Sequence, residues 1–350
     1  MTEFESQAGC ANAVSCIDGE AQEARLPTAL VSAASGYIAA ARAPRTRKSY
    51  ASSWAGFAAW CRDHGRQSLP ASVETVAAWM ASLAKTGKAP ATINTYLASV
   101  VVAHRTAGYA LDRKNPLIAD IWKGIRNETS RAQRQARPLA ADELRSLIAG
   151  MGSVRLADKR DGALIALGWA GALRRSELTG LDWQEPGTGN GTLSLDERGL
   201  VVTLYRSKTS QSEAVTIVVP CQDMPAACSA VADWAKAANL QPGEPVFRRV
   251  IDRKRLTAEP LTDRSVSRII KARVRFHAIT RGKSKAEADE LASMCSGHSL
   301  RAGYATAAAQ ADLPTHRIMQ HTRHKSAEMV CRYIRESDKW TKSGLKGVGF

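Results

Sequence analysis

The sequence predicts a mainly α-helical protein with a small antiparallel β-meander, organised in two domains. Apolar side chains recur at helical spacing early in the chain, as at Tyr50, Trp54 and Phe57. Runs of β-branched and alternating residues, which are typical of strands, occur only between residues 192 and 219. A polar stretch at 127–138 carries three arginines and no large apolar side chain, so we interpret it as an interdomain linker.

The chain before the linker divides into a tail and a helical domain. Residues 1–25 hold five acidic side chains and one basic side chain, without the basic-then-apolar order of a signal peptide, so we expect a disordered acidic tail. Residues 26–126 show no strand alternation and predict a compact all-helical domain. Gly and Pro residues at the expected turns divide this domain into four helices. These should run from Arg45 to Asp63, from Ser72 to Ala84, from Pro90 to Thr106 and from Pro116 to Arg126.

The chain after the linker is expected to form a second domain at 139–335, followed by a C-terminal segment at 336–350. Acidic residues just after Ala140 suit the first turn of a helix. A second helix is expected from Lys159 to Leu181, and helices should resume at Asp223 and continue to the end of the domain. The three strands of the meander should be Thr192–Asp196, Gly199–Tyr205 and Ala214–Val219.

The charge of the chain predicts a partner that is rich in phosphate. There are 49 Lys and Arg residues against 33 Asp and Glu residues, which gives a formal net charge of +16. Residues 244–285 alone contain thirteen basic and four acidic side chains. Such a charge is typical of nucleic-acid-binding proteins, although a surface that only keeps the protein dissolved would have the same composition. No apolar run is long enough to span a membrane.

The seven cysteines are odd in number and show no C-x-x-C spacing. They lie at positions 10, 16, 61, 221, 228, 295 and 331. This pattern favours reduced thiols in a cytoplasmic protein over a disulfide framework or a zinc site.

Three local clusters contain side chains that could take part in chemistry. Arg174 and Glu177 lie three residues apart and so share one helical face. They form either a structural ion pair or an arginine that a carboxylate holds ready to grip a phosphate. Lys208, between the second and third strands, is either a solvated turn residue or a lysine that delivers a proton to a leaving oxygen. The third cluster comprises His298, Arg301, His321, His324 and Tyr333.

Together these clusters predict a transesterification at a phosphodiester that needs no metal ion. Two guanidiniums can neutralise the charge on the non-bridging oxygens, which a metal ion would otherwise do. A phenol can attack phosphorus and form a covalent intermediate that keeps the bond energy, although a lone tyrosine near a C-terminus more often packs than reacts. The chain has no G-x-x-x-x-G-K-[ST] and no H-E-x-x-H motif. No acidic ligand neighbours His298, so we predict neither a metal nor any other cofactor.

The order Arg174, Lys208, His298-x-x-Arg301, His324 and Tyr333 resembles that of the tyrosine recombinase (phage integrase) family. The likeness covers about residues 40–336, and the layout is most similar to that of the Cre-type members. It includes Gly297-His298-Ser-x-Arg301 with a small residue after it, Ile318-Met319-Gln320, and Arg332-Tyr333-Ile334-Arg335.

The resemblance implies a transesterification in which Tyr333 is the nucleophile. Tyr333 would attack the scissile phosphate and leave a 3′-phosphotyrosyl link and a free 5′-hydroxyl. Arg174 and Arg301 would hold the phosphate oxygens, and Lys208 would protonate the departing 5′-oxygen. A 5′-hydroxyl of a partner strand would then attack the phosphotyrosine, so that strands are exchanged through a Holliday junction without ATP or a metal.

The resemblance also implies supporting roles for the remaining residues. His298 would bind the phosphate by a hydrogen bond and assist proton transfer at the tyrosine. His324 would contact the phosphate, and Glu177 would orient the arginine and histidine side chains. The spacing typical of the family selects Arg174 over Arg175 and His324 over His321, so Arg175 and His321 are expected to be structural.

The family further implies that the two domains close around duplex DNA as a C-shaped clamp. Two helices of the first domain should face the major groove, and Arg264 in the second domain is a candidate for a bidentate contact to guanine. The basic run from Arg248 to Lys285 should follow phosphates and set the salt dependence of binding. The candidate DNA-binding residues are Thr46, Lys48, Thr92, Asn94, Thr95 and Arg264.

The expected partner is double-stranded DNA with a specific recombination site. Four protomers should assemble on two such sites, and the C-terminal segment resembles the family segment that docks on a neighbouring protomer. Accessory or directionality proteins are among the partners such enzymes can use. The expected location is the cytoplasm, at the bacterial nucleoid.

Two alternatives to a recombinase use the same residues or the same fold. A type IB-like topoisomerase would relax DNA as a monomer and exchange no strands between duplexes. A non-catalytic, sequence-specific DNA-binding relative would be expected to have lost at least one of the six catalytic residues, and none is lost here.

Overall fold

The computed structural model describes residues 29–30, 32–33, 36–37, 41–129, 135–152, 154–205, 214–252 and 254–338. The chain divides into two compact units, Met1–Gln133 and Arg134–Phe350. Their boundary falls inside the stretch interpreted as a linker, and each unit is described by itself. In the described part of the chain, no helix combines the length and the apolar character that crossing a membrane requires.

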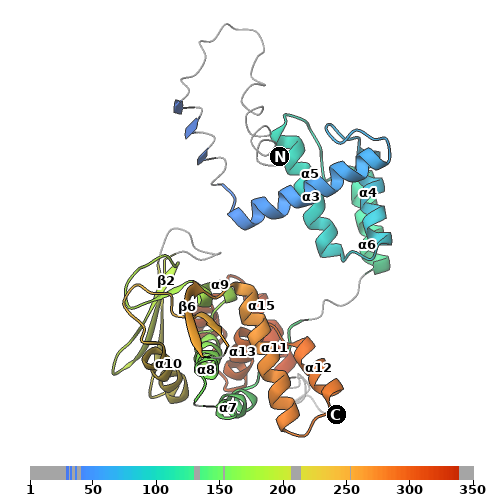
Figure 1. Ribbon diagram of the computed structural model, residues 1–350. Coiled ribbons are helices and arrows are strands. Elements are labelled where there is room, and N and C mark those ends of the chain that lie inside the picture. Colours follow the sequence, from blue (N-terminus) through green and yellow to red (C-terminus); the bar gives the residue numbers. More distant parts are fainter. Residues whose placement is uncertain are drawn as a thin grey trace, which may run out of the picture. The chain divides into compact units, whose positions relative to one another are not determined.

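Between residues 41 and 129, the continuously described part of the first unit, the chain forms four helices (Figure 1). Prolines begin three of them, where a missing N–H costs no hydrogen bond. The hydroxyl of Ser72 caps the remaining helix by accepting from the N–H of Thr75. Gly65, with φ +61°, follows the end of the first helix. The bounds, close to those predicted, are α3 Pro44–Asp63, α4 Val73–Lys85, α5 Pro90–Thr106 and α6 Pro116–Thr129.

The core of the first unit combines aromatic and aliphatic side chains with one buried histidine. The ring centroids of Phe57 on α3 and Trp79 on α4 lie 4.8 Å apart. His104 on α5 is fully buried and uses both ring nitrogens. Its Nε2 accepts from the N–H of Ala71 at 2.8 Å, and its Nδ1 donates to the carbonyl of Val100 at 2.8 Å. This histidine therefore ties the loop before α4 to α5.

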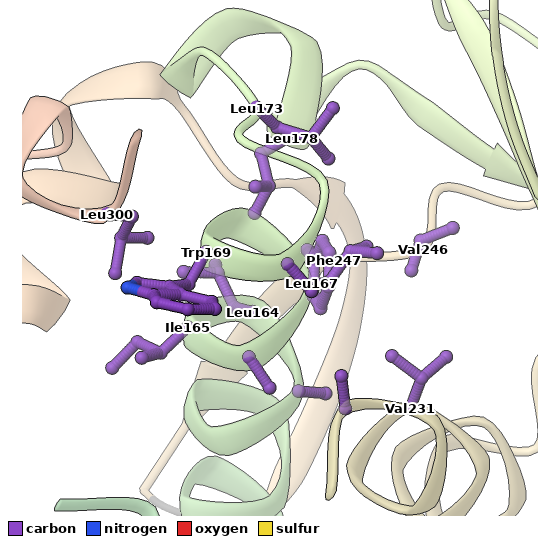
Figure 2. Packing of buried hydrophobic residues seen from close by; sticks show 14 of the residues in the cluster. Leu164, Ile165, Leu167, Trp169, Leu173, Leu178, Val231, Val246, Phe247 and Leu300 are labelled. Atoms are coloured by element: carbon purple, nitrogen blue, oxygen red, sulfur yellow. The ribbon is translucent and has the colours of Figure 1, made fainter. Parts of the chain in front are cut away.

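The second unit is built around one almost completely buried helix, α8. Every residue of α8 from Arg160 to Ala170 is buried, and Figure 2 shows its leucines packed against Val231, Phe247 and Leu300 from other segments. The helices of this unit are α7 Ala141–Ala149, α8 Leu156–Ala170, α9 Arg175–Thr179, α10 Pro225–Ala238, α11 Asp263–Thr280, α12 Lys285–Met294, α13 His298–Gln310, α14 Thr315–Thr322 and α15 Ala327–Asp338.

A four-stranded sheet in the order β1-β2-β3-β4 accompanies these helices. The predicted meander is present, because β2 pairs antiparallel with β3 and β3 pairs antiparallel with β4. Leu193, Val202 and Ile217 face one another across these three strands and are buried. The strands are β1 Leu181–Trp183, β2 Gly191–Leu195, β3 Gly199–Leu204 and β4 Val215–Pro220, with β1 parallel to β2.

Two of the predicted elements were wrong. The helix expected from Lys159 to Leu181 stops at Ala170, because Ala172 adopts φ +44°, which a right-handed helix cannot contain. The short helix α9 follows, and Leu181 already belongs to β1. Strands were expected only in the meander, but β5 Arg248–Ile251 and β6 Arg255–Pro260 form a second antiparallel pair. Their basic and largely exposed residues lack the alternation that marks a half-buried strand.

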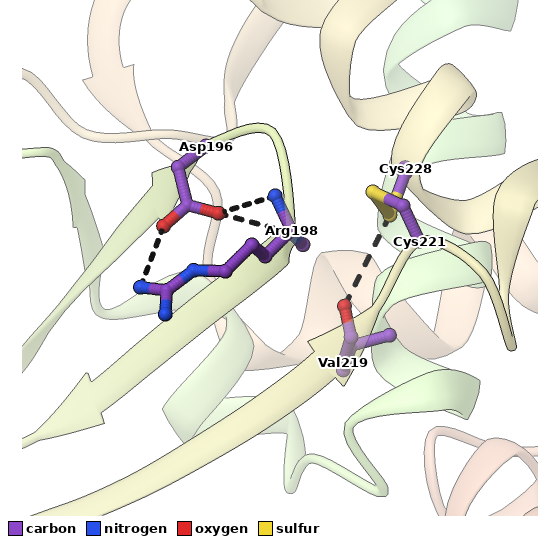
Figure 3. Close-up of a disulfide and its surroundings, with 6 residues drawn as sticks. Asp196, Arg198, Val219, Cys221 and Cys228 are labelled. Carbon is purple, nitrogen blue, oxygen red and sulfur yellow. Dashed lines mark hydrogen bonds and ion pairs between the residues drawn. A yellow bond between two sulfur atoms is a disulfide. The ribbon is translucent and has the colours of Figure 1, made fainter.

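The prediction that all cysteines are reduced was also wrong for one pair. Cys221 and Cys228 form a disulfide with a Cα–Cα distance of 5.7 Å (Figure 3). Cys221 directly follows β4 and Cys228 lies near the start of α10, so the tight connection between strand and helix brings the two sulfurs together. Among the described residues, Cys61, Cys295 and Cys331 are free thiols.

Candidate active site

The turn between α8 and α9 carries Arg174. This residue directly precedes α9 rather than lying within a helix. Its backbone N–H donates to Oε2 of Glu177 at 2.8 Å, and its guanidinium donates to Oε1 of Glu177 at 2.6 Å. Burial opposes ionisation of Glu177, but Arg323 and Arg174 outweigh it and hold the pKa of Glu177 below its ordinary value. The carboxylate is therefore ionised at neutral pH and fixes the direction of Arg174.

Arg301 on α13 is buried under the same turn, with 3% of its surface exposed. It donates from Nη1 to the carbonyl of Ala172 at 2.8 Å and from Nε to Nε2 of His324 at 3.3 Å. Its other terminal nitrogen, Nη2, is buried and has no hydrogen-bond partner among the described residues. An unpaired buried donor is costly, so Nη2 is a ready position for an anionic oxygen. Burial and the charges of Arg174 and Arg323 lower the pKa of Arg301 to about 9.

His324 is held in one orientation by hydrogen bonds at both ring nitrogens. Because Nε2 accepts from Arg301, we assign the proton to Nδ1. Nδ1 lies 2.8 Å from the hydroxyl oxygen of Thr322, which in turn donates to the carbonyl of Ile318 at 2.6 Å. Burial, followed by the charges of Arg301 and Arg174, lowers the pKa of His324 to about 4. The ring is therefore neutral at pH 7.

Tyr333 on α15 lies beside His324, with ring centroids 6.1 Å apart and planes inclined by 31°. It is half-buried against a small apolar cluster that contains Ala305 and Val330. His298, the exposed first residue of α13, is among the groups that lower the pKa of His324. The described part of the site thus brings together cationic guanidinium groups, a neutral imidazole and a phenol.

Comparison with known proteins identifies the family of this site. The model of the phage integrase family matches residues 137–339. An integrase/recombinase xerD homolog from Selenomonas ruminantium is 33% identical over 311 residues, which are 87% of this chain and 85% of that protein. The chain belongs to the phage integrase family.

Further relatives of this phage integrase family member agree with that assignment. Recombinase Cre of Escherichia phage P1 is 27% identical over 296 residues, covering 81% of this chain and 82% of Cre. A solved dimer of lambda integrase bound to a COC′ core site has a TM-score of 0.52 at 16% identity and covers 95% of this chain and 96% of that one. At that identity the likeness concerns the fold. The predictions of a tyrosine recombinase and of a mainly helical fold are confirmed.

The predicted catalytic lysine of this integrase lies outside the described residues. Lys208 belongs to the segment 206–213 between β3 and β4, of which the structure gives no description. Its catalytic role stays a prediction. Among the described residues, no group of three or more His, Cys, Asp and Glu side chains is arranged to hold a metal ion.

The candidate DNA-binding residues of the first unit lie on two helices. Thr46 and Lys48 are exposed on the first turns of α3. On α5, Thr92 is half-buried, and Asn94 and Thr95 are exposed. The exposed positions are accessible to a groove of DNA, and their contacts to bases stay predictions.

Two of these side chains already have hydrogen-bond partners. The amide oxygen of Asn94 accepts from the guanidinium of Arg113, and the hydroxyl of Thr95 donates to the carbonyl of Ala91 at 3.0 Å. In the second unit, Arg264 is exposed near the start of α11.

Arg175 and His321, the two residues expected to be structural, both contact neighbouring elements. Arg175 donates to the hydroxyl of Ser267 on α11 at 3.2 Å, and its side chain lies against Gly297, where an added Cβ would be 2.1 Å from Cγ of Arg175. His321 donates from Nε2 to the carbonyl of Ala170 at 2.7 Å.

Sequence reasoning missed Arg323. This residue sits directly before His324 and donates to Oε2 of Glu177 at 2.8 Å. Nothing in the spacing showed that contact, because Arg323 and Glu177 belong to distant parts of the sequence. The available signal was the position of a basic residue between two histidines of the motif, at 321 and 324.

Proposed function

We propose that this chain is a site-specific DNA recombinase that cuts and rejoins duplex DNA through a 3′-phosphotyrosyl intermediate. The observation that carries the proposal is the unpaired Nη2 of Arg301, buried in a cationic site whose edge is formed by His324 and Tyr333. A phosphodiester brings an anionic oxygen, which satisfies this donor by a charge-assisted hydrogen bond. DNA is the partner that provides such groups.

The proposed reaction is a transesterification at phosphorus. The phenol oxygen of Tyr333 forms a bond to phosphorus while the bond to the 5′-oxygen breaks, and the phenol proton passes to His298. Lys208 gives a proton to the departing 5′-oxygen. Arg174 and Arg301 stabilise the negative charge that develops on the non-bridging oxygens. Attack of a 5′-hydroxyl on the phosphotyrosine reverses these steps and releases Tyr333.

The two histidines have different parts in this proposal. Nε2 of His324 accepts from Arg301, so we assign His324 to orienting Arg301 and to packing beside Tyr333, in addition to the predicted contact with phosphate. His298 is exposed at the N-terminus of α13, where it can bind the phosphate and assist proton transfer at the phenol.

The proposed assembly has four protomers on two copies of one recombination site, with a Holliday junction as the intermediate. The domain assignment stays as predicted: 1–25 as a tail, 26–126 as the core DNA-binding domain, 127–138 as the linker and 139–335 as the catalytic domain. The segment 336–350 would dock on a neighbouring protomer. The nucleoid is the proposed location, and accessory or directionality proteins are proposed as further partners.

A covalent-trapping experiment tests this function. Nicked suicide duplexes drawn from the genomic flanks of the coding sequence are incubated with purified protein in chelator, and a denaturing gel detects a protease-sensitive protein–DNA adduct. We expect an adduct with the native chain and with Tyr109→Phe, a change of an exposed tyrosine in the first unit, and none with Tyr333→Phe.

The other outcomes separate the alternatives. An adduct that persists in Tyr333→Phe would mean that another residue is the nucleophile. Specific binding without an adduct in any variant would favour the non-catalytic DNA-binding function. Relaxation of supercoiled DNA by a monomer, without exchange between two duplexes, would favour a type IB-like topoisomerase.

A further inference from the structure

Side chains from α13, from α14 and from the residue that follows α14 bind three successive carbonyls at the end of α8 and just after it, those of Ala170, Gly171 and Ala172. A helix C-terminus leaves its last carbonyls unpaired and carries partial negative charge. Here the carbonyl of Ala170 accepts from His321, and that of Ala172 accepts from Arg301. The turn that carries Arg174 is thus fixed from the opposite side of the site.

Arg323 makes the largest share of these contacts. Its guanidinium donates to the carbonyl of Gly171 at 3.3 Å and to that of Ala172 at 3.1 Å, as well as to Glu177 at 2.8 Å. Its own carbonyl accepts from Nη2 of Arg174 at 3.3 Å. One residue therefore contacts the turn, the carboxylate and the guanidinium that the turn presents.

The backbone of Arg323 is shaped for this position. The residue ends α14 with φ +57°, in the left-handed region that non-glycine residues seldom adopt. Its side chain is 8% exposed, and that of Glu177 is 4% exposed, whereas that of Arg174 is 18% exposed. Arg323 also differs from Arg301 in its partners, because both of its terminal nitrogens donate to protein groups, whereas Nη2 of Arg301 has no partner among the described residues.

The hydrogen bonds at Glu177 show what Arg323 does to Arg174. Oε2 of Glu177 is taken by Arg323 and by the backbone N–H of Arg174, so only Oε1 accepts from the Arg174 guanidinium. Without Arg323, Oε2 would be free to bind that guanidinium as well, in the bidentate mode that carboxylates and guanidiniums prefer. Arg323 therefore leaves part of the Arg174 guanidinium available to bind a phosphate.

Arg323 also changes the charge of the site. Arg174, Arg301 and Arg323 against one carboxylate, Glu177, leave two net positive charges among these four side chains. A phosphodiester carries one negative charge, and attack by a phenolate adds a second in the transition state. Removing Arg323 would leave a single positive charge for that state.

We propose that Arg323 is a positioning residue that acts through Glu177 and the α8–α9 turn to orient Arg174 for binding the transition state. The proposal rests on the function proposed above. It assigns to Arg323 an effect on the rate of strand cleavage and not on the affinity for DNA.

The test compares Arg323→Gly with Asp312→Gly. Glycine adopts positive φ without strain, so Arg323→Gly removes the guanidinium and keeps the backbone. Asp312 has the same φ of +57° at the exposed end of α13 and is the matched control. On a suicide substrate at saturating DNA, we expect single-turnover cleavage by Arg323→Gly to fall about 100-fold, the scale of a displaced catalytic group, with DNA affinity unchanged. Asp312→Gly should cleave at the native rate.

A neutral substrate separates positioning from general damage. When a methylphosphonate replaces the scissile phosphate, there is less negative charge for Arg174 to neutralise, so the deficit of Arg323→Gly should shrink to less than about tenfold. Arg323→Lys keeps the charge but cannot reach the carboxylate and both carbonyls with one nitrogen, and it should lie between the native chain and Arg323→Gly. Native-like cleavage by Arg323→Gly, an equal deficit on both substrates, or a loss of DNA affinity would overturn the proposal.

A measurement without DNA keeps this proposal distinct from the proposed function. Arg323 is one of the charges that lower the pKa of His324, so NMR titration of the free protein should show a higher His324 pKa in Arg323→Gly and no change in Asp312→Gly. If the native chain forms no adduct on any DNA, the proposed function fails. The titration would still show whether Arg323 lies close to His324 in the free protein. An unchanged His324 pKa in Arg323→Gly would contradict that position of Arg323.

Discussion

At the scale of single residues, the hydrogen bond between Arg301 and His324 fixes the protonation of His324. Arg301 donates through Nε, so His324 must present an unprotonated Nε2. A proton on Nε2 would remove this acceptor and place two positive charges in contact in a buried site. The low pKa of His324, about 4, has this cause after burial itself. The neutral ring is thus a condition for the geometry of Arg301.

This coupling predicts how stability depends on pH. The pKa of His324 is about 4 in the folded chain against an ordinary value of 6.5, so the unfolded chain takes up the proton first as pH falls. The contribution of the neutral His324 ring to the free energy of unfolding is complete above pH 6.5 and is lost as the pH falls toward 4. Between pH 7.5 and pH 5.0, the native chain should lose about 2 kcal/mol of unfolding free energy relative to His324→Gln.

Urea unfolding at the two pH values measures this difference. His316→Gln, a change of an exposed histidine on α14, is the control and should lose as much stability as the native chain. Equal losses in the native chain and in His324→Gln would show that His324 is protonated in the folded state at pH 5.0.

At the scale of elements, the sequence predicted those whose signals are local. The helices of the first unit were predicted closely, because Pro90 and Pro116 mark two starts and Gly65 marks a stop. The meander was predicted from β-branched runs. The break at Ala172 was missed, because alanine favours helix. Its φ of +44° occurs together with contacts of its carbonyl to Arg301 and Arg323, which are distant in the sequence.

The candidate site, like the helices and strands, was predicted where its signals are local in the sequence. The order of the motif residues selects Arg174, His298, Arg301, His324 and Tyr333, because each lies in a recognisable local pattern. The part that arises only from folding was missed, namely the bond of Arg323 to Glu177 and the acceptor role of His324. The first joins the residue that ends α14 to Glu177 on α9, and the second joins the next residue to Arg301 on α13. A single sequence holds no spacing rule for such contacts between distant segments.

The connection between β4 and α10 predicts a redox-dependent stability. A disulfide between Cys221 and Cys228 restricts the unfolded chain over a short loop, which should stabilise the native chain by about 2 kcal/mol. A reductant should therefore lower the unfolding free energy of the native chain and leave Cys221→Ser/Cys228→Ser unchanged. Alkylation of unreduced, unfolded protein followed by mass spectrometry should leave both cysteines unmodified. Modification of both would restore the original expectation of reduced thiols.

At the scale of the whole molecule, the positive charge is concentrated where DNA is expected. Arg264, Arg268 and Lys271 are exposed on α11 at spacings of four and three residues, so they share one face of the helix. The opposite face is buried through Val266 and Ile270. The net charge of +16 is therefore not spread evenly, since α11 presents a basic stripe and buries an apolar one.

This stripe predicts different effects for two of its residues. If Arg264 reads a guanine, Arg264→Gln should weaken binding to the recombination site by about 1–3 kcal/mol and leave binding to a scrambled duplex nearly unchanged. If Lys271 contacts a phosphate, Lys271→Gln should weaken binding to both duplexes alike and reduce the slope of log affinity against log salt by about 1. Fluorescence anisotropy on both duplexes over a salt series measures these effects. Equal weakening of both duplexes by Arg264→Gln would place Arg264 on the phosphate backbone, and sequence recognition by this unit would then have to come from another element.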